Sequence, residues 1–355
     1  MTLGITFNYQ REEFSLDVAL TLPNEGVTAI FGPSGSGKTT LLRVIAGLEN
    51  IDGASIRFND QTWQDHSRFV PVHERNIGFV FQEASLFPHL NVQENLEYGF
   101  NRQSPGKRQV SIEEAAHMLE IENLLHRKPD ALSGGEQQRV AIARTLSASP
   151  GLLLMDEPLS SLDHKLKQTI LPFLENIYKE LAIPVIYVSH ATDEVARLAD
   201  KLVILKKGEV LGNGPIQEML TRLDLPLSHR SDAESLVNAT VSSKDEAHAL
   251  THLNSSGHTF IVTGTDLEIG DTVRLRIAAH DVSLTLDHQS GTSIQNIFPV
   301  TVTEIQDENP SQVLVKLALD TSPILARITR KAVQELDIAP GKNLFAQIKS
   351  VAVLS

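Results

Sequence analysis

The chain contains the octapeptide Gly32-Pro33-Ser34-Gly35-Ser36-Gly37-Lys38-Thr39, which matches the phosphate-loop pattern G-x-x-x-x-G-K-[ST]. A short β-rich run, residues 27–31, precedes it, and an apolar helical pattern, residues 40–48, follows it and should end at Gly47. In this context backbone N–H groups and the positive end of the helix dipole converge on an anion. The sequence therefore predicts an ATP-phosphate site made by Gly32, Pro33, Ser34, Gly35, Ser36, Gly37, Lys38, Thr39 and Thr40.

Polar residues at two other predicted strand ends fit the same site. Asp156 and Glu157 close the apolar run 152–155, and His190 follows the apolar run 184–189. A carboxylate beside a phosphate loop can hold magnesium, and a neighbouring carboxylate can act as general base toward water. We assign catalysis to Glu157, His190 and Gln82, and Mg²⁺ to Thr39, Gln82 and Asp156. The alternatives are a solvated acidic turn and a structural histidine.

The pattern of apolar runs separates two regions. Up to about residue 229, continuous apolar strands between helical stretches predict a parallel sheet covered on both faces, closed by a hairpin at 203–211. Beyond residue 230, runs such as 272–277, 281–286, 300–305 and 313–317 alternate apolar with polar residues, which is typical of a small barrel. We therefore expect an α/β domain at residues 1–229 and a β-rich domain at residues 230–355.

Composition limits the functions open to the chain. Its 355 residues carry a net charge of −13, which argues against a general nucleic-acid partner, because phosphate backbones need clustered Lys and Arg. It has no cysteine, so disulfides and thiolate metal sites are excluded. The apolar runs are far shorter than the roughly 20 residues of a membrane span, and the start lacks a signal-peptide pattern. We expect a soluble chain that reaches any membrane by docking onto another protein.

A family resemblance rests on a second glycine motif, Leu132-Ser133-Gly134-Gly135-Glu136-Gln137-Gln138. Together with the phosphate loop, Gln82, Asp156-Glu157, Ser161-Leu162-Asp163 and His190, in that order, it makes residues 3–215 resemble the ATP-binding subunit of an ABC transporter. The resemblance implies an α/β P-loop ATPase domain of the ABC type, with a helical subdomain. It also implies a head-to-tail homodimer that clamps two ATP molecules.

In that dimer each ATP lies between one subunit's phosphate loop and the other's Ser133, Gly134, Gly135 and Glu136. A serine and two glycines at a helix start can form a second anion-binding nest, although an ordinary helix start capped by Ser133 is the plain alternative. The resemblance also places a dimer-interface D-loop at Ser161, Leu162 and Asp163. It implies an aromatic residue that stacks on adenine, for which we choose Tyr9 over Phe7.

Transporter subunits of this family also dock onto permeases. The resemblance implies contact with two integral-membrane permease subunits through Ser85, Leu86, Phe87 and Pro88, and thus a peripheral position on the cytoplasmic face of the cell (inner) membrane. The alternative for Leu86 and Phe87 is a place in the core.

The cargo is indicated by the C-terminal region. Residues 292–300 and 345–351 resemble a molbindin-type, OB-like transport-associated domain spanning about 292–354, and residues 276–284 also resemble molybdate importers. The resemblance implies a small all-β OB-like domain and an ATP-driven importer of molybdate or tungstate, supplied by an extracytoplasmic molybdate-binding protein. Hydroxyls, amides and a cation suit a tetrahedral dianion, so we select Ser293, Asn296, Lys349 and Ser350 as a regulatory oxyanion site.

Three alternatives stay open. The C-terminal region could be a structural barrel that aids dimerisation, and the importer could carry sulfate, ferric iron or a sugar. A soluble ABC-type ATPase of repair or translation is disfavoured, because such proteins usually carry coiled-coil insertions or tandem motor units and this chain shows one motor and a barrel.

Overall fold

The computed structural model describes residues 2–11, 14–104, 106, 108–160, 162–181, 183–264 and 266–354. It separates the chain into two compact units, Met1–Asn213 and Gly214–Ser355. The division lies N-terminal to the boundary expected near residue 230. The reason is that α7 (Ile216–Thr221) packs against β11 (Glu234–Asp245) and β18 (Ser322–Thr329), both in the second unit.

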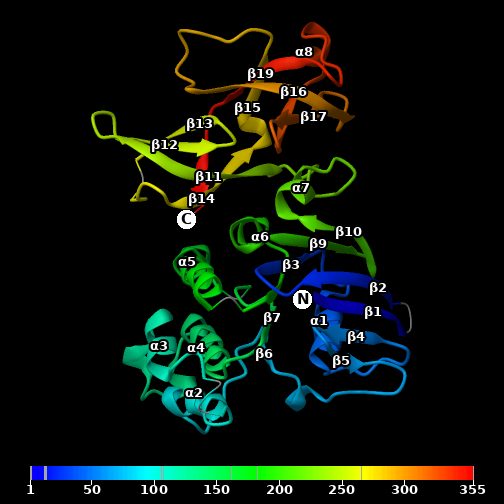
Figure 1. Cartoon of the computed structure of the whole chain (residues 1–355), viewed down its shortest axis with the longest axis vertical. Coiled ribbons are helices and arrows are strands. Elements are labelled where there is room, and N and C mark those ends of the chain that lie inside the picture. Colours follow the sequence, from blue (N-terminus) through cyan, green and yellow to red (C-terminus); the bar gives the residue numbers. More distant parts are fainter. Residues whose placement is uncertain are drawn as a thin grey trace. The chain divides into compact units, whose positions relative to one another are not determined.

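The first unit is built on a ten-stranded sheet (Figure 1). Its central strands pair in parallel, β3 with β8 and β9, and β7 with β6 and β8, whereas β1 pairs antiparallel with β2 and β4. β3, β7 and β8 are buried at every residue, which is why their sequences are continuously apolar. In spatial order the strands are β5 (Gln61–Gln64), β4 (Ser55–Phe58), β1 (Thr2–Arg11), β2 (Phe14–Pro23), β10 (Glu209–Pro215), β9 (Lys201–Lys206), β3 (Val27–Phe31), β8 (Val185–Ser189), β7 (Leu152–Asp156) and β6 (Ile77–Val80).

The register of the parallel strands brings three chain segments to one edge of the sheet. Phe31 lies opposite Ser189, and Asp156 lies opposite Val188. The phosphate loop, Glu157 and His190 therefore leave the sheet side by side, where ligands of open α/β sheets bind. The helix α1 (Lys38–Ala46) starts in the loop and ends at Gly47, whose φ of 77° is left-handed.

Three helices form a separate helical group, α2 (Val92–Phe100), α3 (Ile112–Met118) and α4 (Gly134–Ser147), visible together in Figure 1. Each begins with a capping box, in which a Ser or Asn side chain and a Glu three residues later satisfy each other's backbone donors. The predicted helical subdomain is thus confirmed. Single 3₁₀ turns lie at η1 (Val72–Glu74), η3 (Glu122–Leu124), η4 (Pro129–Ala131) and, in the second unit, η5 (Ala279–Asp281).

Two further helices follow the strands that carry the candidate site. α5 (His164–Leu181) follows β7, α6 (Thr192–Leu198) follows β8, and the two helices pack against each other. Within the described ranges, no helix is both long and apolar enough to cross a membrane.

The second unit consists of β-strands and two short helices, α7 and α8 (Arg330–Glu335), and its segment 292–354 forms the expected OB-like part. Its two five-stranded sheets share one core that contains Phe260, Leu275 and Phe298. The predicted strands at 272–277, 281–286, 300–305 and 313–317 are present, but we assigned none to β11, β12 or β13. One sheet has the order β13 (His258–Thr263), β12 (Leu250–Ser255), β11, β14 (Thr272–Ala278) and β20 (Ala352–Leu354); the other has β15 (Val282–Thr285), β19 (Asn343–Ile348), β16 (Asn296–Asp307), β17 (Gln312–Leu319) and β18.

Candidate functional site

The phosphate loop borders a cavity of about 440 Å³ at the edge where β3, β7 and β8 end. Gly35 and Gly37 have φ values of 78° and 102°, and a Cβ on Gly37 would lie 2.9 Å from a methyl group of Leu16. Glycine is therefore required at this turn for both conformation and space. The cavity is lined by Phe14, Ser34, Gly35, Gly37, Lys38, Thr39, Thr40, Gln82 and Glu157.

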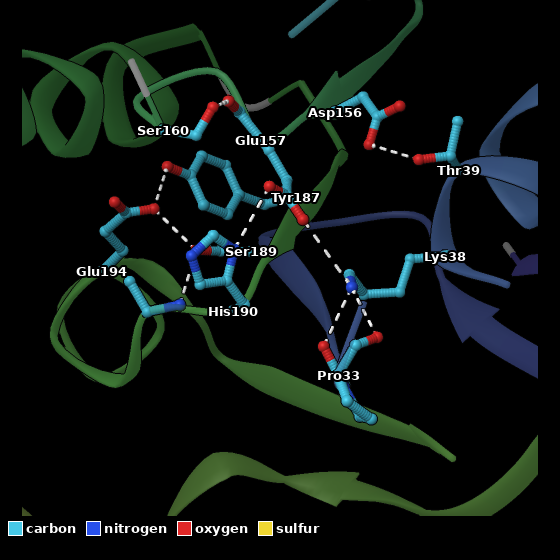
Figure 2. A network of polar contacts seen from close by, with 12 residues as sticks. Pro33, Lys38, Thr39, Asp156, Glu157, Ser160, Tyr187, Ser189, His190 and Glu194 are labelled. Carbon is cyan, nitrogen blue, oxygen red and sulfur yellow. Dashed lines mark hydrogen bonds and ion pairs between the residues drawn. The ribbon is translucent and has the colours of Figure 1, made fainter. Parts of the chain in front are cut away.

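Lys38 also holds the shape of the phosphate loop. Lys38 is only 5% exposed, and its Nζ donates to the carbonyl oxygens of Gly32 (2.8 Å) and Pro33 (3.1 Å). Ser36 is buried. Figure 2 shows the lysine reaching over the loop toward Glu157, whose Oε1 lies 3.6 Å from Nζ. The loop thus fixes a buried cation beside the place where phosphates would bind.

The candidate magnesium ligands lie at the same edge. Thr39 Oγ1 donates to Asp156 Oδ1 at 3.1 Å, and Gln82 lines the cavity. Burial raises the pKa of Asp156, and the Thr39 hydrogen bond partly offsets this. No group of three or more His, Cys, Asp and Glu suited to a metal occurs among the described residues. A hydroxyl, one carboxylate and an amide therefore fit Mg²⁺ completed by phosphate oxygens and water, rather than an all-protein cage.

Glu157 and His190 meet beside the lysine. The backbone N–H of Glu157 donates to the Val188 carbonyl at 3.0 Å, which ties the turn after β7 to β8. Glu157 Oε2 lies 3.2 Å from His190 Nδ1, and Glu157 has a left-handed φ of 45°. The structure thus brings together Lys38, Thr39, Gln82, Asp156, Glu157 and His190 as the sequence predicted.

The loop that carries Gln82 is held on both sides by one helix. Gln138 of α4 is buried and donates from Nε2 to the Phe81 carbonyl at 3.3 Å. Arg144 of α4 donates to the Ser85 carbonyl at 3.1 Å. These two contacts, which sequence reasoning did not find, connect the Gln82 loop to the helix that begins at the second glycine motif.

The predicted permease-docking residues have mixed surroundings. Ser85 and Pro88 are exposed, whereas Leu86 is partly buried against the core of the helical group. The Phe87 ring lies 4.4 Å from the Tyr98 ring, and Arg144 lies over its face. Leu86 therefore fits the core alternative in part, and docking through this segment stays a prediction.

The second glycine motif forms the start of α4. Ser133 caps the helix, and its N–H and Oγ both donate to Glu136 Oε2 at 2.7 Å, which lowers the pKa of Glu136. Ser133 and Gly134 are exposed, but Gly135 is buried, and a Cβ there would lie 2.2 Å from Leu166. The capping alternative is thus realised, and the exposed helix start stays a candidate for contact with a second ATP.

The predicted D-loop is described only in part. Ser161 lies outside the described residues. Leu162 is a buried core residue, and Asp163 accepts the Leu166 N–H at 2.9 Å, which caps α5. An interface role for these residues stays a prediction.

The aromatic residue beside the phosphate cavity is Phe14 rather than the predicted Tyr9, and stacking on adenine stays a prediction. Phe14, at the start of β2, lines the phosphate cavity, whereas Tyr9 does not appear in that lining. Both residues pack against the core of the sheet, and the Tyr9 ring lies 6.3 Å from the Phe14 ring. The register of the β1–β2 hairpin accounts for this difference. It pairs Phe14 with Arg11 near the tip of the hairpin and Tyr9 with Leu16 further from the tip.

The four predicted oxyanion residues share one small pocket of about 210 Å³ in the second unit. Ser293, Asn296, Lys349 and Ser350 all line it. However, Asn296 accepts the N–H of Ile261 at 2.8 Å and donates to its carbonyl at 2.9 Å. The buried amide therefore holds β13 to β16, and the hydroxyls and Lys349 are left as anion donors.

Comparisons with known proteins show which chains this one resembles. A family model described as "ABC transporter" matches residues 16–160, and one described as "TOBE domain" matches residues 292–354. The molybdenum import ATP-binding protein ModC of Albidiferax ferrireducens is 50% identical over 357 residues, which cover 99% of this chain and 97% of the relative. The protein of the same name from Pseudomonas fluorescens is 50% identical over 360 residues and 100% of both chains.

Solved structures match the first part of the chain. The ATP-binding cassette MJ0796, solved as a post-hydrolysis dimer bound to ADP and Pi, is 32% identical with a TM-score of 0.52, over 61% of this chain and 98% of that one. The structure of cbiO1 from Clostridium perfringens, part of the ABC transporter complex cbiONQ, is 29% identical with a TM-score of 0.53, over 61% and 89% of the two chains.

Proposed function

This chain belongs to the ABC transporter ATP-binding family, and we propose that it is the ATP-hydrolysing subunit of a molybdate importer. The observation that carries the proposal is the 50% identity to molybdenum import ATP-binding proteins over nearly the full length of both chains. The convergence of Lys38, Asp156, Glu157 and His190 at one cavity edge supports the chemistry.

The proposed reaction is attack of water on the γ-phosphorus of ATP. Glu157 accepts a proton from the water as the new P–O bond forms and the bond to the bridging oxygen breaks, which gives ADP and phosphate. His190, 3.2 Å from Glu157, orients that carboxylate and donates toward the γ-phosphate. Lys38 offsets the phosphate charge from within the loop. Bound Mg²⁺, held by Thr39, Asp156 and Gln82, would polarise the phosphate oxygens.

We also propose the assembly in which this reaction does work. The exposed Ser133 and Gly134 at the start of α4 support a head-to-tail homodimer, in which this motif faces the partner's ATP. MJ0796 was solved as a dimer, and cbiO1 belongs to a transporter complex. By this analogy, two permease subunits dock near residues 85–88, at the cytoplasmic face of the membrane. An extracytoplasmic molybdate-binding protein would deliver the cargo.

For the second unit we propose regulatory binding of molybdate or tungstate. Ser293, Lys349 and Ser350 support this by lining one pocket with two hydroxyls and a cation. A purely structural role is the competing function, favoured by the use of Asn296 in strand pairing.

The test is ATPase stimulation in membranes that contain the full-length chain and its permease. A molybdate-loaded binding protein should stimulate hydrolysis, whereas binding proteins loaded with sulfate, ferric iron or sugar should not. Stimulation by one of those others would reassign the cargo. Absence of any hydrolysis by the assembled complex would overturn the ATPase function itself.

A further inference from the structure

A buried carboxylate lies directly behind the predicted catalytic histidine. Glu194, on the first turn of α6, is 2% exposed. Its Oε2 accepts hydrogen bonds from Ser189 Oγ (2.7 Å) and Tyr187 OH (2.9 Å), and its Oε1 accepts from Lys167 Nζ (2.8 Å). Burying a carboxylate costs free energy unless donors and a cation satisfy it, and here three donors do so.

This carboxylate is connected by hydrogen bonds to the residues on both sides of His190. Ser189 precedes the histidine and donates to Glu194, and the same hydroxyl accepts the N–H of Ala191, which follows the histidine, at 3.0 Å. Figure 2 shows Glu194, with the Tyr187 hydroxyl turned toward it, to the left of His190, and Glu157 on the other side. The backbone on both sides of the exposed His190 is therefore tied to a buried carboxylate through the Ser189 hydroxyl.

The anchor also reaches the helix that follows the predicted D-loop. Lys167 lies on the first turn of α5, and its backbone N–H donates to the carbonyl of Asp163 at 3.0 Å. Its ammonium group, 18% exposed, pairs with Glu194. The start of α5 and the His190 loop are thus joined through one ion pair.

We propose that Glu194 is a positioning residue, which fixes His190 against Glu157 through Ser189 and joins that arrangement to α5 through Lys167. This inference rests on the proposed ATPase function and deepens it. Tyr187 completes the anchor, since burial and the Glu194 charge raise the pKa of its phenol and keep it a donor.

The test uses purified full-length chain at saturating Mg-ATP. Ser189→Ala, which cuts the link to His190 with the loss of one oxygen, and Glu194→Gln should each lower kcat about tenfold, because small misplacements of catalytic groups cost that much or more. The KM for ATP should change by no more than about twofold, since the phosphate loop is untouched. If Glu194→Gln fails to fold, as judged by thermal unfolding, Ser189→Ala carries the test alone.

Two further sets of variants distinguish a positioning role of Glu194 from a general effect on stability. In a His190→Ala background, Ser189→Ala and Glu194→Gln should have no further effect on kcat, because the group they position is gone. Glu175→Gln is the matched control: Glu175 joins the same two helices through Arg197 at 3.2 Å, toward the other end of α6, and this variant should keep the wild-type kcat.

Wild-type kcat in Ser189→Ala and Glu194→Gln, with a clear loss in His190→Ala, would overturn the inference and leave the ATPase function standing. Additive losses in the His190→Ala background would overturn it as well. Absence of ATP hydrolysis by the wild-type chain would instead remove the proposed function from which the inference starts, whereas unchanged hydrolysis in Glu157→Gln would remove only the role of Glu157 as base.

Discussion

The two units place their candidate sites in the fold by different means. In the first, Lys38, Thr39, Asp156, Glu157 and His190 come from three separate strand ends and contact one another directly. In the second, the candidate residues line one pocket, but the best-placed amide is occupied by strand pairing. Parallel strands collect polar residues at one edge, whereas the antiparallel sheets of the second unit have no such edge and their polar residues also serve the fold.

The candidate site residues of the first unit are also more deeply buried than those of the second. Lys38 and Asp156 are 5% and 6% exposed and are paired, so their charges act in a poorly screened environment. Ser293, Lys349 and Ser350 are exposed, so water and salt weaken any attraction for an anion. The first site is therefore expected to depend steeply on single residues and the second only weakly.

The largest expected effect concerns the candidate site of the first unit, where activity should depend steeply on single residues. Glu157→Gln should lower the kcat of ATP hydrolysis at least about 100-fold, because a general base contributes that much or more. ATP binding, measured by equilibrium dialysis, should be retained since the phosphate loop is intact. Hydrolysis at the wild-type rate would show that Glu157 is not the base.

The next effect tests whether Asn296 belongs to the fold or to the ligand site. Asn296→Ala leaves the Ile261 backbone N–H and carbonyl without these partners, which should cost about 1–3 kcal/mol in the free energy of unfolding. Denaturant unfolding of the full chain measures this. Undiminished stability together with lost molybdate binding would return Asn296 to the ligand site.

A third prediction concerns the aromatic residue at the cavity. Phe14→Ala should raise the KM for ATP about tenfold, within the roughly 1–3 kcal/mol that base stacking on an aromatic contributes. Tyr9→Ala is the matched variant, since Tyr9 lies nearby but outside the cavity lining. A larger rise in KM for Tyr9→Ala than for Phe14→Ala would restore the choice made from sequence.

The smallest effect belongs to the exposed pocket. Lys349→Ala should weaken molybdate binding only about two- to fivefold, because an exposed charge contributes about 1 kcal/mol or less. Calorimetry on the full-length chain measures it, with Lys331→Ala as a control at another exposed lysine of the same unit. Absence of molybdate binding in the wild-type chain would leave the structural role for this unit.

Sequence patterns predicted that Lys38, Thr39, Asp156, Glu157 and His190 lie close together, because these residues end the glycine loop or stand at the end of a continuous apolar strand. They did not predict Glu194, since its role arises only when Lys167, Tyr187 and Ser189 fold against it. The sequence did not show the hairpin register, which places Phe14 rather than Tyr9 beside the cavity, and adenine stacking by either residue stays a prediction. Asn296 was assigned by its chemistry, and only the packing of β13 on β16 shows where its hydrogen bonds go.

The rigidity of α4 has a mechanical consequence. A helix of 14 residues is about 20 Å long and cannot shorten without breaking its hydrogen bonds. Ser133 caps its N-terminus, and Gln138 and Arg144 further along the helix donate hydrogen bonds to the loop on both sides of Gln82. Ser133 and the Phe81 and Ser85 carbonyls are therefore joined through one helix, and we expect a displacement of the helix along its axis to shift the loop that carries Gln82 as well.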